Sequence, residues 1–213
     1  MKLVGIDETR IIRQLYINGL KEIHSDISTL SRQLEVSYEC LDKTIKSLEK
    51  TKSITIDSEN NIHLTPFGRK QITIVMTGGT FDILHVGHLY TIKQARLLGD
   101  ALVVVLATDN NVKRLKNRLP ANNLNDRAEV LEGVNNVDAV VKGSETDFMS
   151  TVDLIDPDVI ALGYDQAEEE RDLYESVSAR GHFHVKIIRL EKYVPGKSTT
   201  KIMQDIIEHN YRK

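Results

Sequence analysis

Apolar positions follow two different rhythms along the 213-residue chain. In the first third they recur every three or four residues, as on one face of an α-helix, and then alternate with polar residues. This pattern predicts helices over residues 10–18, 27–34 and 38–50, followed by a hairpin of residues 53–56 and 61–64. Asp57, Ser58, Glu59 and Asn60 favour a turn between the two strands.

From residue 71 onward, short apolar runs rich in β-branched residues alternate with helical or mixed segments. Such alternation predicts a parallel sheet with helices on both faces. The expected strands cover residues 72–77, 102–107, 139–142, 159–162 and 185–190. We therefore expect a small α+β domain over residues 1–69. An α/β domain over residues 70–213 should follow, a Rossmann-like, doubly wound, five-stranded parallel sheet.

Charge, cysteine count and the length of apolar runs argue against several classes of protein. The chain has 28 basic and 31 acidic residues, a net charge of −3, so it offers no strong field for nucleic acid or a membrane surface. Its one cysteine excludes an internal disulfide, and no apolar run approaches the roughly 20 residues that span a bilayer. With no secretory signal visible, we expect a cytoplasmic protein without a membrane partner.

The most informative segment is residues 77–88, where a hydrophobic strand runs into glycines, a threonine and two histidines as a helix is expected to begin. Helix N-termini favour anions, and Gly78 and Gly79 allow close backbone approach. His85 and His88 can then face one phosphate, where an imidazole donates a hydrogen bond or carries positive charge. An HxxH pair can also be zinc ligands or ordinary surface residues. The neighbouring glycines and hydroxyls favour the phosphate, so we predict no protein-bound metal.

Three further motifs follow expected strand ends, where ligands bind in such sheets. After the fourth strand, Asp165 could accept from a ribose hydroxyl or a base amine, or equally cap a helix. Near the C-terminus, Lys197 and the hydroxyls of residues 198–200 form a second anion site at a helix start, with Ser198 also the N-cap. The basic cluster at residues 113–118 could cover phosphates or be a solvated helix face, the latter less so for Lys116.

The segment at residues 77–88 resembles the signature of the cytidylyltransferase-like nucleotidyltransferases, in which the HxGH histidines stabilise the pentacovalent α-phosphate. Residues 197–202 resemble the same family's serine- and threonine-rich signature. The resemblance implies that His85 and His88 are catalytic. The nucleotide-binding residues implied are Gly79, Thr80, Phe81, His85, Val86, Gly87, His88, Asp165, Tyr193, Ser198 and Thr199, with Lys116 and Asp82 near the phosphates or the acceptor. Arg127 resembles a family arginine that we expect to be structural first.

Within this family, residues 163–166, followed by three glutamates, are most similar to the archaeal FAD synthases. That resemblance implies transfer of AMP from ATP to FMN with release of pyrophosphate, Mg²⁺ or another divalent cation accompanying the triphosphate, and a homodimer. A cysteine common in that group is absent here. The alternative is a CTP-dependent transfer to glycerol phosphate or a similar phosphorylated alcohol. Tyr193 and Val194 stand where glycerol-phosphate enzymes show an Arg-Thr pair, which weighs against it. Tyr193 could stack on a base or flavin ring, or simply pack.

The first 70 residues resemble a winged helix-turn-helix domain, which suggests another class of function, a nucleotide-sensing DNA-binding regulator. Charge argues against strong DNA binding, because residues 1–70 contain 11 basic and 10 acidic residues. In the helix expected to read DNA, three lysines are interspersed with three acidic residues. A protein-interaction or dimerisation module is the alternative.

Overall fold

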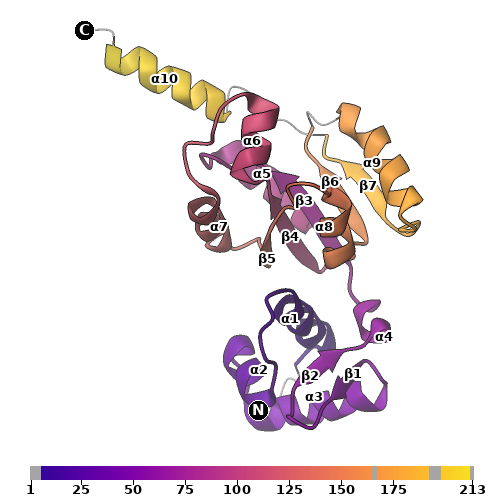
Figure 1. Cartoon of the computed structure of the whole chain (residues 1–213). Helices are drawn as coiled ribbons and strands as arrows, with labels where there is room; N and C mark the ends of the chain where they lie inside the picture. The colour runs from indigo at the N-terminus through magenta and orange to yellow at the C-terminus, as the bar shows by residue number, and fades with distance from the viewer. Residues whose placement is uncertain (1–5, 165–166, 192–197, 212–213) are drawn as a thin grey trace. The chain divides into compact units, whose positions relative to one another are not determined.

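The computed structural model describes residues 6–164, 167–191 and 198–211 (Figure 1). The chain divides into two compact units, Met1–Thr73 and Ile74–Lys213, and each is described by itself.

The N-terminal unit consists of three helices, a hairpin and a short fourth helix. The elements are α1 (Glu8–Leu20), α2 (Ile27–Leu34), α3 (Tyr38–Lys50), β1 (Ile54–Ile56), β2 (Ile62–Leu64) and α4 (Pro66–Arg69). Asp7 and Asp26 cap α1 and α2 by accepting from backbone N–H groups of the first turn. Ile11, Leu30 and Leu41, one from each long helix, are fully buried, and β1 pairs antiparallel with β2. The predicted order of three helices and a hairpin is confirmed, whereas membership of the winged-helix family stays a prediction.

The second unit is an α/β layer structure around one parallel sheet. Its strands are β3 (Ile74–Gly79), β4 (Ala101–Leu106), β5 (Ala139–Lys142), β6 (Val159–Leu162) and β7 (Lys186–Arg189). Its helices are α5 (Val86–Arg96), α6 (Asp109–Lys116), α7 (Leu124–Glu132), α8 (Phe148–Ile155), α9 (Ala167–Ala179) and α10 (Thr199–Tyr211). All four strand pairings are parallel, so the predicted five-stranded Rossmann-like sheet is confirmed.

Strand order places the ligand-binding end of the sheet. The order is β5-β4-β3-β6-β7, so the chain builds outward in one direction from β3 through β4 to β5, and in the other direction through β6 to β7. The order therefore reverses between β3 and β6, and in such sheets the crevice beyond the carboxyl ends at that point holds the ligand.

The core explains why the two central strands are almost entirely apolar. Every residue of β4 is buried, as are Ile74–Met76 of β3, because helices cover both faces of the sheet. Val75, Leu102 and Val104 pack with Ile92 of α5. Among the described residues, no helix is long and apolar enough to cross a membrane.

Candidate active site

The turn between β3 and α5 is held in one shape by packing beneath it. Phe81 has a positive φ of 47°, an uncommon conformation for a residue with a large side chain, and its ring is buried in the core. A Cβ on Gly79 would lie 2.8 Å from that ring, so a side chain cannot be added there without displacing it. At Gly78 the nearest atom to an added Cβ is 3.8 Å away, so this glycine is not required by packing. Both glycines line the pocket described below.

His85 and His88 come together at the first turn of α5, as the spacing predicts. His85 is the N-cap, and its Nδ1 accepts from the Gly87 N–H at 3.1 Å, so the proton of the neutral ring is on Nε2. The two imidazoles stack, with ring centroids 3.9 Å apart and planes inclined by 24°. Val86 is the first residue of α5, is exposed, and does not line the pocket.

His88 is held neutral by its surroundings. Burial is the main cause that lowers its pKa from 6.5 to about 4, and the charges of His85 and Lys116 act in the same direction. The Ile83 carbonyl and the Asp82 carboxylate oppose the shift without reversing it. Nδ1 of His88 is buried and has no hydrogen-bond partner within the described residues.

Asp82, predicted near the phosphate or the acceptor, is engaged with the loop that follows α6. Its carboxylate accepts from the backbone N–H groups of Ala121 at 2.7 Å and Asn122 at 3.1 Å, and pairs with Arg118 at 3.2 Å. Its side chain is only 1% exposed. Asn122 in turn donates from its side chain to the Asp82 carbonyl at 2.7 Å. These contacts fasten the end of α6, and with it Lys116, to the HxGH turn.

Arg127 lies in α7, is fully buried, and connects the loops at the strand ends. Its guanidinium donates to the carbonyls of Thr80, Ala107 and Asn122 at 2.6, 2.8 and 3.0 Å. It also pairs with Asp109 at 2.7 Å. A planar group with five donors can serve four such acceptors at once. Arg127 therefore has the structural role expected for it.

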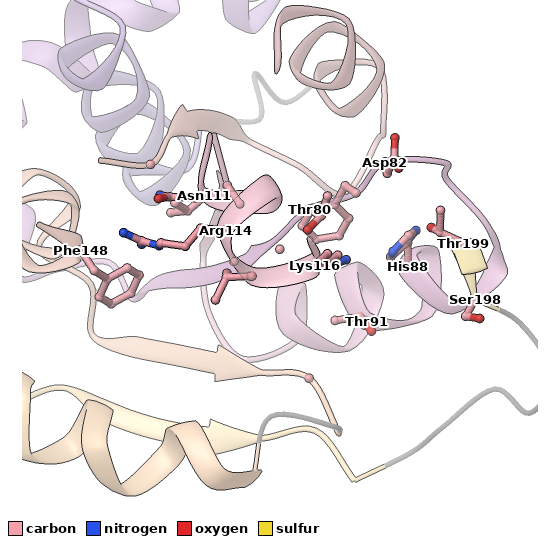
Figure 2. A pocket seen from close by; sticks show the side chains of 18 of the residues that line it. Thr80, Asp82, His88, Thr91, Asn111, Arg114, Lys116, Phe148, Ser198 and Thr199 are labelled. Atoms are coloured by element: carbon pink, nitrogen blue, oxygen red, sulfur yellow. The ribbon is translucent and has the colours of Figure 1, made fainter. Parts of the chain in front are cut away.

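A pocket of about 840 Å³ opens over these elements at the carboxyl ends of the strands. One wall is α6, from which Asn111, Arg114 and Lys116 face the pocket (Figure 2). Leu115 of the same helix also lines it. In the described part of the chain neither Arg114 nor Lys116 pairs with a carboxylate. Two cations are thus available to an anionic ligand.

The first turn of α10 forms another wall. Ser198 and Thr199 line the pocket beside His88 (Figure 2), and Thr199 Oγ1 donates to the Ile83 carbonyl at 3.4 Å. Ser198 Oγ accepts from the Lys201 N–H at 3.1 Å, the cap expected from the sequence. Two helix N-termini, of α5 and α10, therefore meet at one pocket. Gly163 and Tyr164 also line it, whereas Asp165 and Tyr193 lie outside the described residues.

The sequence interpretation missed the segment between β5 and α8, residues 143–148, all of which line the pocket. Asn111 of α6 donates to the Ser144 carbonyl at 3.0 Å, which joins this segment to the basic wall. An added Cβ on Gly143 would lie 3.1 Å from the Leu106 carbonyl oxygen, so a side chain there would require a shift of a few tenths of an ångström at the strand end. A glycine at the end of a parallel strand was the available signal, since the same argument pointed to Gly78 and Gly79.

Taken together, a parallel sheet with its switch point at this pocket and a histidine pair beside two available cations is an arrangement for nucleotidyl transfer. A family model described as "Cytidylyltransferase-like" matches residues 76–205, more than half of the chain. The chain belongs to this family, and it is a nucleotidyltransferase.

Individual relatives match about two thirds of the chain. The chain is 43% identical over 136 residues to an FAD synthase of Aciduliprofundum boonei, spanning 63% of this chain and 90% of that protein. It is 44% identical over 143 residues to an FAD synthase of Thermococcus kodakarensis, spanning 66% and 95%. A solved structure, described as the lipopolysaccharide core biosynthesis protein from Thermoplasma volcanium, is 40% identical, with a TM-score of 0.55. That match covers 58% of this chain and 99% of the solved one.

Proposed function

We propose that the chain is an FAD synthase, which transfers AMP from ATP to FMN and releases pyrophosphate. The relatives named FAD synthase, matched over at least nine-tenths of their own length, support this choice. The observation in this chain that carries it is the apolar rim of the pocket. Leu115, Phe148 and Tyr164 line it while being 75%, 45% and 43% exposed.

That rim separates the two candidate acceptors by their chemistry. The isoalloxazine ring of FMN has large apolar faces that can cover exposed aromatic and aliphatic side chains. Glycerol phosphate, the acceptor of the CTP-dependent alternative, has no comparable apolar surface. Burial of such surface is favourable by about 25 cal/mol per Å², so FMN gains from this rim and glycerol phosphate does not.

In the proposed reaction, a phosphate oxygen of FMN attacks the α-phosphorus of ATP, and the bond from that phosphorus to the α–β bridging oxygen breaks. The bridging electron pair leaves with pyrophosphate, and charge builds on the oxygens around the α-phosphorus. His85, with its proton on Nε2, donates toward that charge, and His88 joins it as donor or cation. Arg114 and Lys116 neutralise the pyrophosphate, while the first turns of α5 and α10 orient the phosphates.

The divalent cation expected with the triphosphate has no carboxylate cage among the described pocket residues. Asp82 is engaged by backbone N–H groups and Arg118, Glu145 accepts from the Asn110 side chain at 2.9 Å, and Asp147 pairs with Arg180 at 3.2 Å. Mg²⁺ prefers phosphate oxygens and water in such sites. We therefore propose that it enters as part of the Mg–ATP substrate, and no step above depends on a metal bound by the protein.

The test crosses ATP and CTP with FMN and glycerol phosphate, and measures pyrophosphate release together with the nucleotide product. We expect turnover with ATP and FMN alone, and a fall of roughly 10²–10³-fold in His85→Ala. Phe148→Ala should raise KM for FMN and leave KM for ATP nearly unchanged. Turnover with CTP and glycerol phosphate would establish the alternative.

DNA binding by the N-terminal unit and formation of a homodimer stay predictions, and no contact described above supports either. In the helix expected to read DNA, Lys43 and Lys46 each pair with a carboxylate one turn earlier, at 2.9 and 2.7 Å. Those lysines are thus partly neutralised within α3. A mobility-shift assay with the gene's own upstream DNA tests the regulator, and sedimentation tests the dimer.

A further inference from the structure

A second group of side chains suited to ligand binding lies at the amino ends of the strands, whereas the pocket lies at their carboxyl ends. Asp156 follows α8 and precedes β6, with a left-handed φ of 46°. His182 and His184 lie between α9 and β7 and flank the exposed Phe183. All three therefore stand at the amino ends of parallel strands, whereas the pocket stands at the carboxyl ends. One ligand atom from each lies within 4.8 Å of the other two.

The three groups converge at spacings that leave room for an ion between them. Asp156 Oδ1 is 4.0 Å from Nδ1 of His182 and 3.7 Å from Nε2 of His184, both longer than a hydrogen bond. By contrast, His182 Nε2 is only 2.7 Å from Asp153 Oδ1. Ligands of a tetrahedral zinc ion, with bonds of about 2.0–2.1 Å, are separated by about 3.3 Å. Inward movements of under about 1 Å per side chain would bring the three to that spacing.

Asp153 fixes the tautomer of the neutral His182 ring in the form that a metal needs. A carboxylate can only accept, so in the neutral ring Nε2 carries the proton and Nδ1 presents its lone pair toward Asp156. A ligating histidine that donates its other N–H to a carboxylate is the usual supporting arrangement of metal sites. The nearby cation, Arg180, is balanced by Asp153 at 2.8 Å and Asp147 at 3.2 Å.

We propose that Asp156, His182 and His184 bind a divalent transition-metal ion of the Zn²⁺ class. Two imidazoles and one carboxylate suit such ions, whereas Mg²⁺ prefers oxygen ligands alone. Three protein ligands leave the fourth position to water, which the exposure of the cluster allows. The ion would join the end of α8 to the start of β7, so its role is to stabilise the fold and not to take part in nucleotidyl transfer.

The test is titration of the EDTA-treated full chain with Zn²⁺ by calorimetry, and with Co²⁺ by visible absorption. We expect one site that is weakened by more than 10²-fold in His184→Ala and in Asp156→Asn. Asparagine tolerates the left-handed backbone at position 156, so the second variant keeps the local fold. Asp153→Asn should weaken binding by roughly 10–100-fold, as loss of a supporting hydrogen bond does.

Two controls separate this site from others that bind zinc. His63 makes the same kind of exposed contact with an aspartate, at 2.7 Å to Asp57, but has no third ligand in that contact. His63→Ala should leave affinity unchanged. The stacked pair His85 and His88 is the second control, because it could itself take up Zn²⁺. Binding lost in His85→Ala/His88→Ala but retained in His184→Ala and Asp156→Asn would overturn the proposal, as would no binding at all.

Discussion

The protonation of His88 gives the sharpest test of how this site handles negative charge. In the free chain its pKa is lowered to about 4, first by burial and then by the charges of His85 and Lys116. At pH 7 about one molecule in a thousand then carries the proton. A triphosphate in the pocket replaces water with anionic oxygens, which favour the protonated ring.

The two effects can be compared in size. A shift from 6.5 to about 4 corresponds to at most about 3 kcal/mol, and to less because solvent reaches part of the ring. One phosphate charge about 4 Å from the imidazolium contributes about 4 kcal/mol at an effective dielectric constant of about 20. The attraction therefore matches or exceeds the burial effect. We expect nucleotide binding to raise the pKa of His88 to roughly 6–7, close to neutral pH.

The measurement is a pH titration of imidazole nitrogens by NMR, with and without Mg²⁺ and an ATP analogue whose α–β bridge cannot be cleaved. Absence of the signal in His88→Asn assigns it. A free-state pKa near 6.5 would refute the account of burial. A pKa that stays below 5 with the analogue bound would refute the role of His88 as a cation in the transition state.

Four other predictions follow from the same contacts. Because the folded pKa of His88 is depressed, the unfolded chain binds more protons between about pH 4 and 6.5. The free energy of unfolding of the wild type, measured by urea titration, should therefore fall by at most about 2 kcal/mol between pH 7 and pH 5. His88→Asn should not show this fall. Arg127→Met should lower that free energy by about 3–5 kcal/mol, and Arg127→Lys by less. Gly79→Ala should lower it by about 1–3 kcal/mol, while Gly78→Ala should leave it nearly unchanged and reduce kcat/KM for ATP. Lys116→Met should reduce kcat/KM by roughly 10²-fold and raise the pKa of His88 in the NMR titration.

The sequence was sufficient where local pattern decides the structure. Five apolar runs became the five strands with end shifts of at most two residues, because short runs rich in β-branched residues have few alternatives to a strand. The histidine pair could also be placed, since residues three apart at a helix start necessarily share a side. The cap at Ser198 is local in the same sense.

What could not be predicted depends on contacts between residues far apart in the chain. Asp82 binds backbone N–H groups 39 and 40 residues later, and nothing near it in the sequence distinguishes that role from a phosphate contact. The segment at residues 143–148 reaches the pocket because β5 is the edge strand beside β4, which is a property of strand order. Strand order is set by long-range pairing, which periodicity does not encode.

The residues of the site therefore fall into two groups, which differ in how far apart in the sequence their contacts lie. His85, His88, Lys116 and Thr199 face the pocket and sit on short local motifs. Asp82 also lines the pocket, but its carboxylate, like the buried guanidinium of Arg127, holds those motifs together through N–H and carbonyl groups of the loops. A shift of about 1 Å in a catalytic group can reduce the rate by about 10²-fold, so loss of either support should reduce turnover almost as much as loss of a histidine. The two kinds of variant differ in their free energy of unfolding, because only loss of Asp82 or Arg127 leaves buried polar groups unpaired.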